Sequence, residues 1–237
     1  MCKILHLETA TQRCSVALSE GENILALKES DEKNAHSQVI TVWIDELLHA
    51  FNLQPSGIDA IAVSMGPGSY TGLRIGVSTA KGLCYALDKP LIAVNTLQSM
   101  AVGMIAEFFP NKSDFNEKTL FCPMIDARRM EVYSALFDGN HRQVREIKAE
   151  IISGESFNEE FETHEIVFGG DGAEKCKSFF AERNNAHFLD HFYPSAKFMA
   201  EIAVEKYEKN EFENVAYFEP FYLKDFIAAL PKVKGLY

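Results

Sequence analysis

The sequence predicts an α/β protein made of two similar domains. Strand-like runs alternate with amphipathic helical segments, which favours parallel strand pairing. Each half also opens with a strand–turn–strand meander before its α/β units, so both sheets are expected to be mixed. The chain has 237 residues, of which 47% are hydrophobic and 24% charged. That length and composition suit two domains of roughly 100–120 residues, each with a buried core.

The first half contains the clearer elements. We expect strands at 4–7, 14–18, 24–27, 59–64 and 91–94, and helices at 37–51, 73–87 and 96–108. In the first helix Ile40, Ile44 and Leu47 recur at three- and four-residue steps, which places them on one stripe. Val39 and Val42 widen that stripe. This helix is therefore expected to contact the core on one face and a partner on another.

The second half begins after a polar stretch at 109–118, which is the best candidate for a domain boundary. We expect strands at 120–126, 130–137, 144–149 and 165–168, and helices at 173–181 and 196–207. The predicted division is a first domain over 1–108, joined by the C-terminal segment 216–237, and a second domain over 109–215.

Charge and cysteine content indicate which classes of function and cellular environment suit this chain. The formal net charge is −11, and the densest basic stretch holds only Arg128 and Arg129. We therefore do not expect direct, unaided RNA binding. The five cysteines are scattered without a Cys-x-x-Cys pair, which indicates free thiols in a reducing cytoplasm. No apolar run is long enough to span a bilayer, and the N-terminal apolar run is too short for a signal peptide.

Glycines gather around the end of the strand at 59–64. Gly66, Gly68 and Gly72 occupy the strand-to-helix loop, and Gly76 and Gly82 follow in the helix. Such a loop can present backbone N–H groups to an anion. Its spacing fits neither a P-loop nor a dinucleotide fingerprint. The same glycines are equally typical of a tight turn followed by a close-packed helix, so both readings stay open.

Candidate catalytic and metal-binding side chains are few. Glu8 and Asp126 each end an apolar strand, where α/β proteins gather functional carboxylates but also turn-forming ones. His187 and His191 have the spacing of helical metal ligands, yet the sequence around His187 favours a strand. Ser69 lies beside Gly68 without a recognisable histidine or aspartate partner.

Several segments resemble the bacterial TsaB (YeaZ) family, and the resemblance spans essentially the whole chain. The segment at 60–76, continued at 78–83, carries most of it. The other matching segments are Glu8-Thr9-Ala10, Ala35-His36-Ser37-Gln38, Met124-Ile125-Asp126-Ala127-Arg128, Glu131-Val132-Tyr133, Gly170-Asp171-Gly172-Ala173 and Pro220-Phe221-Tyr222-Leu223-Lys224.

The resemblance implies a two-domain actin/Hsp70/sugar-kinase-like fold (the ASKHA fold), in which the last helix packs back on the first domain. It implies a role in forming N6-threonylcarbamoyladenosine beside the anticodon of ANN-decoding tRNAs. In that reaction a TsaD-like subunit transfers the threonylcarbamoyl group and a TsaE-like ATPase is the third component. A TsaB-like chain is their non-catalytic cytoplasmic partner, is a homodimer when alone, and meets tRNA only through the complex.

The resemblance also implies which residues act. TsaD-like enzymes bind a metal through His-x-x-x-His on the first long helix, and here the matching residues are His36 and Ile40. No catalytic residue, metal site or intrinsic cofactor is therefore expected, and ATP and a divalent metal belong to the partner subunits. Residues that would face an anion or nucleotide are Glu8, Thr9, Gly66, Gly68, Ser69, Gly170 and Gly172. Residues expected at the partner interface are His36, Val39, Trp43, Leu47, Tyr70, Thr71, Arg74, Gly76 and Lys81.

Other functions remain to be weighed against this one. A glycoprotease-like metallopeptidase would need the second histidine that Ile40 replaces. A sugar-kinase-like ATPase would need a Mg²⁺–nucleotide site at Glu8, Thr9 and the glycine turns. A simple binding module would hold an anionic ligand on the loop 66–72.

Overall fold

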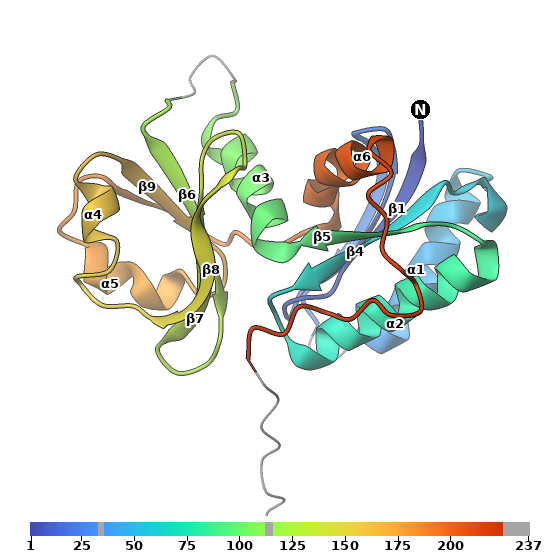
Figure 1. Ribbon diagram of the computed structural model, residues 1–237, viewed down its shortest axis with the longest axis horizontal. Coiled ribbons are helices and arrows are strands. Elements are labelled where there is room, and N and C mark those ends of the chain that lie inside the picture. Colours follow the sequence, from blue (N-terminus) through green and yellow to red (C-terminus); the bar gives the residue numbers. More distant parts are fainter. Residues whose placement is uncertain (33–35, 112–115, 225–237) are drawn as a thin grey trace, which may run out of the picture.

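The computed structural model describes residues 1–32, 36–111 and 116–224. They form two five-stranded mixed sheets that lie side by side (Figure 1). The first sheet has the order β3 (Asn23–Ser30), β2 (Cys14–Glu20), β1 (Lys3–Glu8), β4 (Ala60–Gly66) and β5 (Leu91–Asn95). The second has the order β8 (Gln143–Ile151), β7 (Glu131–Phe137), β6 (Thr119–Asp126), β9 (Glu165–Gly169) and β10 (Ala186–Leu189). The two sheets therefore have the same topology, as the repeated sequence pattern predicts.

Helices cover both sheets. They are α1 (His36–Ala50), α2 (Tyr70–Leu87), α3 (Thr96–Phe108), α4 (Asn158–Phe161), α5 (Lys177–Phe180) and α6 (Ala200–Glu208), with 3₁₀ turns η1 (Pro55–Gly57), η3 (Glu174–Cys176) and η4 (Ala196–Met199). The single helix predicted at 173–181 is wrong, because η3 and the four-residue α5 occupy that place. Within the described residues, no helix has the length and apolarity to cross a membrane.

In the first sheet, β1, β2, β4 and β5 are buried on both faces, because alternate side chains enter two different cores. Leu5 and Leu7 of β1 pack in the core that includes α1 and α2. Ile4 of the same strand packs with Met199 and Ile202, which belong to η4 and α6. The last helix thus packs on the first half, as the family resemblance implies.

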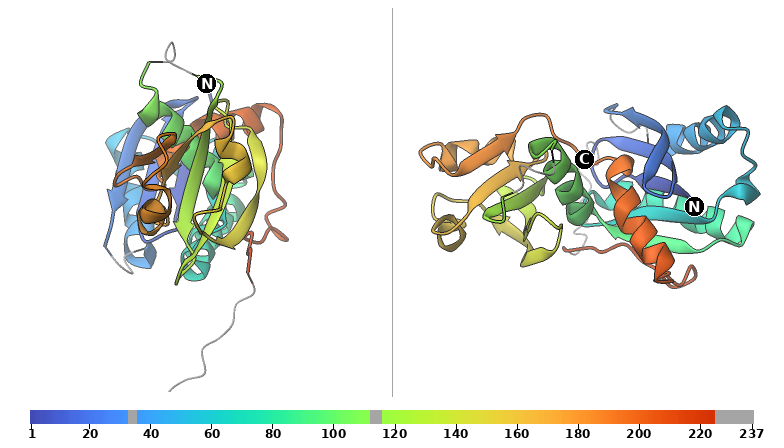
Figure 2. Two further views of the ribbon diagram at one scale, coloured as in Figure 1. Left: turned by 90° about the vertical axis from the view of Figure 1, so that its left-hand side faces the viewer. Right: turned by 90° about the horizontal axis from the view of Figure 1, so that it is seen from above.

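The helix that follows β5, α3, packs on the second sheet. α3 buries Leu97, Met100 and Met104 against side chains of the second sheet such as Phe121. Figures 1 and 2 show α3 beside the second sheet and α6 beside the first, both near the middle of the molecule. α3 thus lies at the end of the predicted first segment but packs on the second sheet, and α6 lies in the predicted second segment but packs on the first sheet.

The last described residues return along the first half. Glu213 forms a bridge to Leu91, and Phe218 is buried with the core of α1 and α2. Lys81 of α2 donates to the carbonyl oxygens of Ala216 and Phe218, at 3.2 and 3.0 Å. The chain is thereby fixed along α2 and leads to the space between the two sheets, where the described residues end.

Candidate functional site: two sealed strand ends and an exposed helical face

The turn after β1 is buried inside the first half. Glu8 and Thr9 both have 0% of their surface exposed. Oε1 of Glu8 accepts a hydrogen bond from the backbone N–H of Ala10 at 2.7 Å, whereas Oε2 and the Thr9 hydroxyl have no partner among the described residues. Burial raises the pKa of Glu8 to about 7, against the opposing effect of the Ala10 N–H. Neither predicted nucleotide-facing side chain reaches the surface.

The glycine loop after β4 is filled by that same turn. A Cβ placed on Gly68 would lie 2.3 Å from the carbonyl oxygen of Ala10, and one on Gly72 would lie 2.1 Å from that of Thr9. Three of the loop's N–H groups bond within the protein: Ser69 donates to Ala10 O at 2.6 Å, Gly66 donates to Thr96 Oγ1 at 3.2 Å, and Gly72 donates to Ser69 Oγ at 3.3 Å. The glycines are therefore needed for close backbone packing, and the structure favours the tight-turn reading over the anion site.

The corresponding glycine turn after β9 is filled in the same manner. A Cβ on Gly170 would lie 2.2 Å from the carbonyl oxygen of Met124, and one on Gly172 would lie 2.9 Å from the carbonyl carbon of Ile125. Between them, Asp171 accepts a hydrogen bond from the N–H of Asp126 at 2.9 Å. The predicted purine-facing turn is thus closed by the end of β6.

The residues present do not fit the metal site of TsaD-like enzymes. His36 is buried, and its Nε2 lies 3.0 Å from the backbone oxygen of Thr11. Ile40, at the position of the second histidine, is packed in the core. His187 lies in β10, as the sequence predicts, and His191 follows the strand, so they share no helical face. The described residues contain no group of three or more histidine, cysteine, aspartate or glutamate side chains that could hold a metal ion.

The outward face of α1 and α2 is the part of the predicted interface that reaches the surface. Thr71 and Arg74 are exposed, and Val39, Trp43, Tyr70 and Lys81 are partly exposed. Their neighbours His36, Leu47 and Gly76, which the sequence analysis also placed at the interface, are buried within the chain. Leu47 faces the sheet, and Gly76 faces the Thr9 hydroxyl, 2.2 Å from where its Cβ would lie.

This outward face also contains Val42, which the sequence analysis placed on the widened stripe of the first helix, and Tyr85, which the sequence analysis did not name. Val42 is 51% exposed and Tyr85 is 88% exposed. Tyr70, Thr71, Arg74, Ile75 and Ser78 line a shallow hollow of about 420 Å³ along α2. The exposed residues of α2 follow three- and four-residue steps from Thr71 to Tyr85, so helical periodicity could have identified Tyr85. We call the exposed and partly exposed residues of α1 and α2 the α1–α2 face.

Comparison with known proteins shows which family the chain resembles. A family model described as "TsaD: tRNA N6-adenosine threonylcarbamoyltransferase" matches residues 28–232. The chain is 30% identical to the Escherichia coli tRNA threonylcarbamoyladenosine biosynthesis protein TsaB, over 95% of this chain and 96% of that protein. It is similar to the solved structure of YeaZ from Pseudomonas aeruginosa, with a TM-score of 0.76, 25% identity, and coverage of 94% of this chain and 100% of that one.

The fold is shared more widely. The activator of the 2-hydroxyisocaproyl-CoA dehydratase from Clostridium difficile, solved with bound ADPNP, matches 90% of this chain and 98% of its own with a TM-score of 0.50. At 12% identity this likeness concerns the fold alone. The two mixed sheets have the same topology, and the matches to TsaB and YeaZ cover nearly the whole chain. The chain therefore has an ASKHA-type fold and belongs to the TsaB (YeaZ) family.

Proposed function

We propose that this chain is a non-catalytic partner subunit in the formation of N6-threonylcarbamoyladenosine in tRNA. It binds a TsaD-type transferase through the α1–α2 face, and a TsaE-type ATPase completes the complex in the cytoplasm. ATP and the divalent metal are held by those partners, and tRNA is modified only by the assembly. The names of the full-length relatives support the pathway, and the exposed apolar residues of the α1–α2 face support the role.

The shape of the α1–α2 face favours a helical partner. Val42, Trp43 and Tyr85 give it apolar and aromatic side chains, which are enriched in the centres of protein interfaces. Gly82 of α2 is exposed, and no atom lies within 4 Å of the position that its Cβ would take. A second helix can therefore approach the α2 backbone closely at this point. The same face serves for a homodimer when the chain is alone.

The sealed strand ends favour a role without chemistry. An enzyme of this fold would need polar side chains facing a substrate, yet Glu8 and Thr9 face the protein interior. Both glycine turns contact backbone atoms of the neighbouring strand instead of leaving space. The chain can thus keep the shape of the fold while it contributes its surface to another subunit.

Reconstitution tests the proposal. The TsaD-type and TsaE-type proteins are assayed for modified adenosine with and without this chain, and the chain is also assayed alone. We expect modification only in the full mixture. Val42→Asp and Tyr85→Glu should each prevent co-purification with the transferase and dissociate the homodimer, because each places a charge in an apolar contact.

Ile151→Glu is the matched control, because Ile151 is an exposed apolar residue, 71% accessible, on the edge strand of the other sheet. This variant should assemble normally. Modification that proceeds equally well without this chain would refute the partner role. Normal assembly of both α1–α2 variants would refute the interface while leaving the role open to another surface.

A further inference from the structure

The turn between β6 and β7 has an unusual backbone. Arg128 and Arg129 are consecutive and both have positive φ, at 74° and 55°. Side chains with a Cβ are strained in this region, and hairpin turns that require it favour Asn-Gly. Two arginines therefore occupy positions at which Asn-Gly would be less strained. Strained residues of this kind are concentrated at functional sites.

Other parts of the second half hold the turn in place. Lys175 donates to the carbonyl oxygens of Arg129 and Glu131, at 2.9 and 2.8 Å, and to Asp126. Asp126 also accepts the N–H of Arg128 at 2.8 Å. The backbone that carries the two guanidinium groups is thus fixed from both sides, so the groups are presented in a defined place.

Neither guanidinium is neutralised within the protein. Arg128 and Arg129 are exposed and form no side-chain hydrogen bond or ion pair with any described residue, whereas Arg13 is bonded to Asp31 and Arg145 to Glu150. The acidic groups beside the turn are already engaged. These pairs are Asp126 with Lys175 and Glu131 with Lys224.

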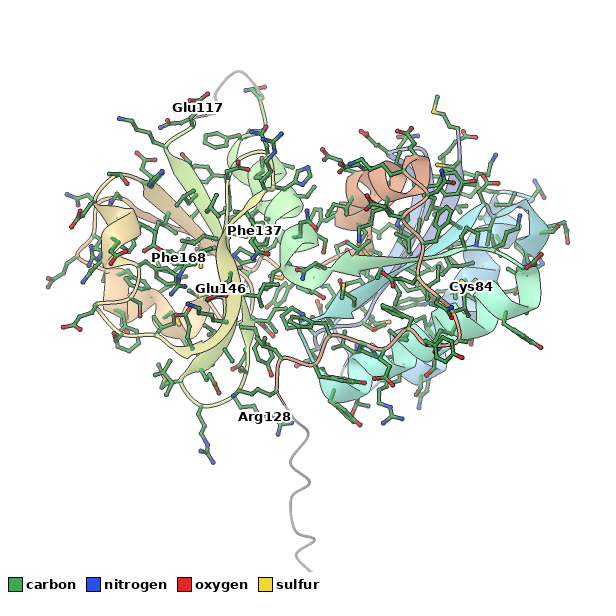
Figure 3. All side chains as sticks on the ribbon, viewed as in Figure 1. Cys84, Glu117, Arg128, Phe137, Glu146 and Phe168 are labelled. Atoms are coloured by element: carbon green, nitrogen blue, oxygen red, sulfur yellow. The ribbon has the colours of Figure 1, made fainter. Side chains whose placement is uncertain are left out.

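Further positive charge and aromatic surface surround the turn. Burial raises the pKa of Tyr133, and the charge of Glu131 raises it further, while the charges of Lys224 and Arg128 act in the opposite direction. Tyr222, partly exposed, precedes Lys224 by two residues. Figure 3 shows Arg128 at the edge of the molecule, next to the point where the described chain ends. Cations interleaved with aromatic rings are typical of surfaces that bind nucleic-acid strands.

We propose that Arg128 and Arg129 bind the phosphate backbone of the tRNA that the complex modifies. The inference rests on the proposed function, which supplies the RNA. Planar guanidinium groups match phosphate oxygens in charge and geometry. The turn belongs to the second sheet, whereas the α1–α2 face belongs to the first half. The chain thereby adds phosphate contacts to the complex although its net charge is −11.

The test replaces the two arginines with the residues that the turn prefers. The double variant Arg128→Asn/Arg129→Gly is assembled with the transferase and the ATPase, and tRNA binding is measured over a range of salt concentrations. Each lost phosphate contact lowers the slope of log K against log salt by about 0.7–0.9, so the slope should fall by about 1.5 and affinity by about 30-fold at about 0.1 M salt. The melting temperature should stay the same or rise, since backbone strain is removed. If the two arginines had only a structural role, the melting temperature of this variant would fall.

Two further variants distinguish the effect of the positive charges from the effect of the turn's backbone. Arg128→Lys/Arg129→Lys keeps the charges and should keep most of the salt slope. Arg142→Asn is the matched control: Arg142 is also exposed and has no side-chain hydrogen bond or ion pair with a described residue, but it lies in the turn at the other end of β7. This variant should bind tRNA as the unmodified chain does.

The remaining outcomes overturn the inference. Unchanged tRNA affinity in the Asn/Gly variant means that the turn does not touch RNA. Loss of assembly with the partner proteins means that the arginines meet an acidic protein surface. A loss of ATP binding with tRNA affinity intact assigns the phosphate to a nucleotide. Failure of the unmodified chain to support modification would refute the proposed function itself, and that result is seen before any variant is compared.

Discussion

Each half of the molecule has a carboxylate at the end of its first strand, and the two carboxylates differ in burial and in pairing. Glu8 ends β1 and Asp126 ends β6, and each accepts a hydrogen bond from the N–H two residues ahead, at 2.7 and 2.8 Å. Glu8 is fully buried with one oxygen unpaired, whereas Asp126 is exposed and paired with Lys175. The topology thus fixes the local turn, and the elements packed against it decide whether that turn reaches the surface.

The helices explain the difference. In the first half the 18-residue α2 lies over the turn, and its glycines admit the backbone of Thr9 and Ala10. In the second half the corresponding region holds only η3 and the four-residue α5. A short helical segment cannot cover the turn, so the β6–β7 turn remains at the surface with its arginines exposed. The glycine turns of both halves are filled, but the carboxylate that ends β1 is buried and the one that ends β6 is exposed.

The largest expected effect comes from the glycines that seal the first half. Gly72→Ala should lower the free energy of unfolding by roughly 4 kcal/mol, because the new Cβ would lie 2.1 Å from a backbone oxygen that cannot easily move. Gly172→Ala, the change in the second half, meets its nearest atom at 2.9 Å and should cost roughly 2 kcal/mol. Chemical denaturation measures both.

Gly82→Ala is the control within α2, because no atom lies within 4 Å of its added Cβ. It should raise the free energy of unfolding by about 0.5–1 kcal/mol through helix propensity. Equal effects of the three alanine substitutions would contradict the view that the distance from the added Cβ to the nearest backbone atom sets the cost at each glycine.

Next in size is the pH dependence that Glu8 imposes. Its pKa is about 7 in the folded protein against an ordinary value of 4.5, because burial disfavours the charge. Between these two pH values the folded state binds more protons than the unfolded state, so stability falls as the pH rises. Above about pH 7 the loss is complete and amounts to roughly 3 kcal/mol.

Glu8→Gln removes this ionisation. Unfolding free energies of the unmodified and variant proteins, measured from about pH 5 to pH 8, should differ by an amount that changes by roughly 3 kcal/mol across the range. Asp126→Asn is the corresponding change in the second half, at a carboxylate that is exposed and paired with Lys175. A flat curve for Glu8→Gln would mean that the first-half carboxylate is not sealed from solvent.

The smallest effect concerns the lysine that only the second-half turn possesses. Lys175→Met should lower the free energy of unfolding by about 1–2 kcal/mol, because the oxygens of Asp126, Arg129 and Glu131 lose their donor. Lys148→Met, at an exposed ion pair on β8, should change it by less than about 0.5 kcal/mol. Indistinguishable results for the two lysines would show that the β6–β7 turn is not held by Lys175.

Local sequence determined much about this protein. Short apolar runs located the strands, three- and four-residue spacing located α1, and the repeated meander predicted two sheets of the same kind. The motifs around the glycine loop and the β6–β7 turn identified the family, because residues near one another in the chain carried the signal. These features depend on short-range backbone preferences and side-chain periodicity, which a sequence displays directly.

Only the tertiary structure decided what those elements do. It placed α3 on the second sheet and α6 on the first, buried His36 and Leu47, and brought the backbone of Thr9 against Gly72. It also left Arg128 and Arg129 without acidic partners by engaging Asp126 and Glu131 elsewhere. Such outcomes depend on contacts between residues far apart in the chain, so packing space and the choice of ion-pair partner are settled only when the chain folds.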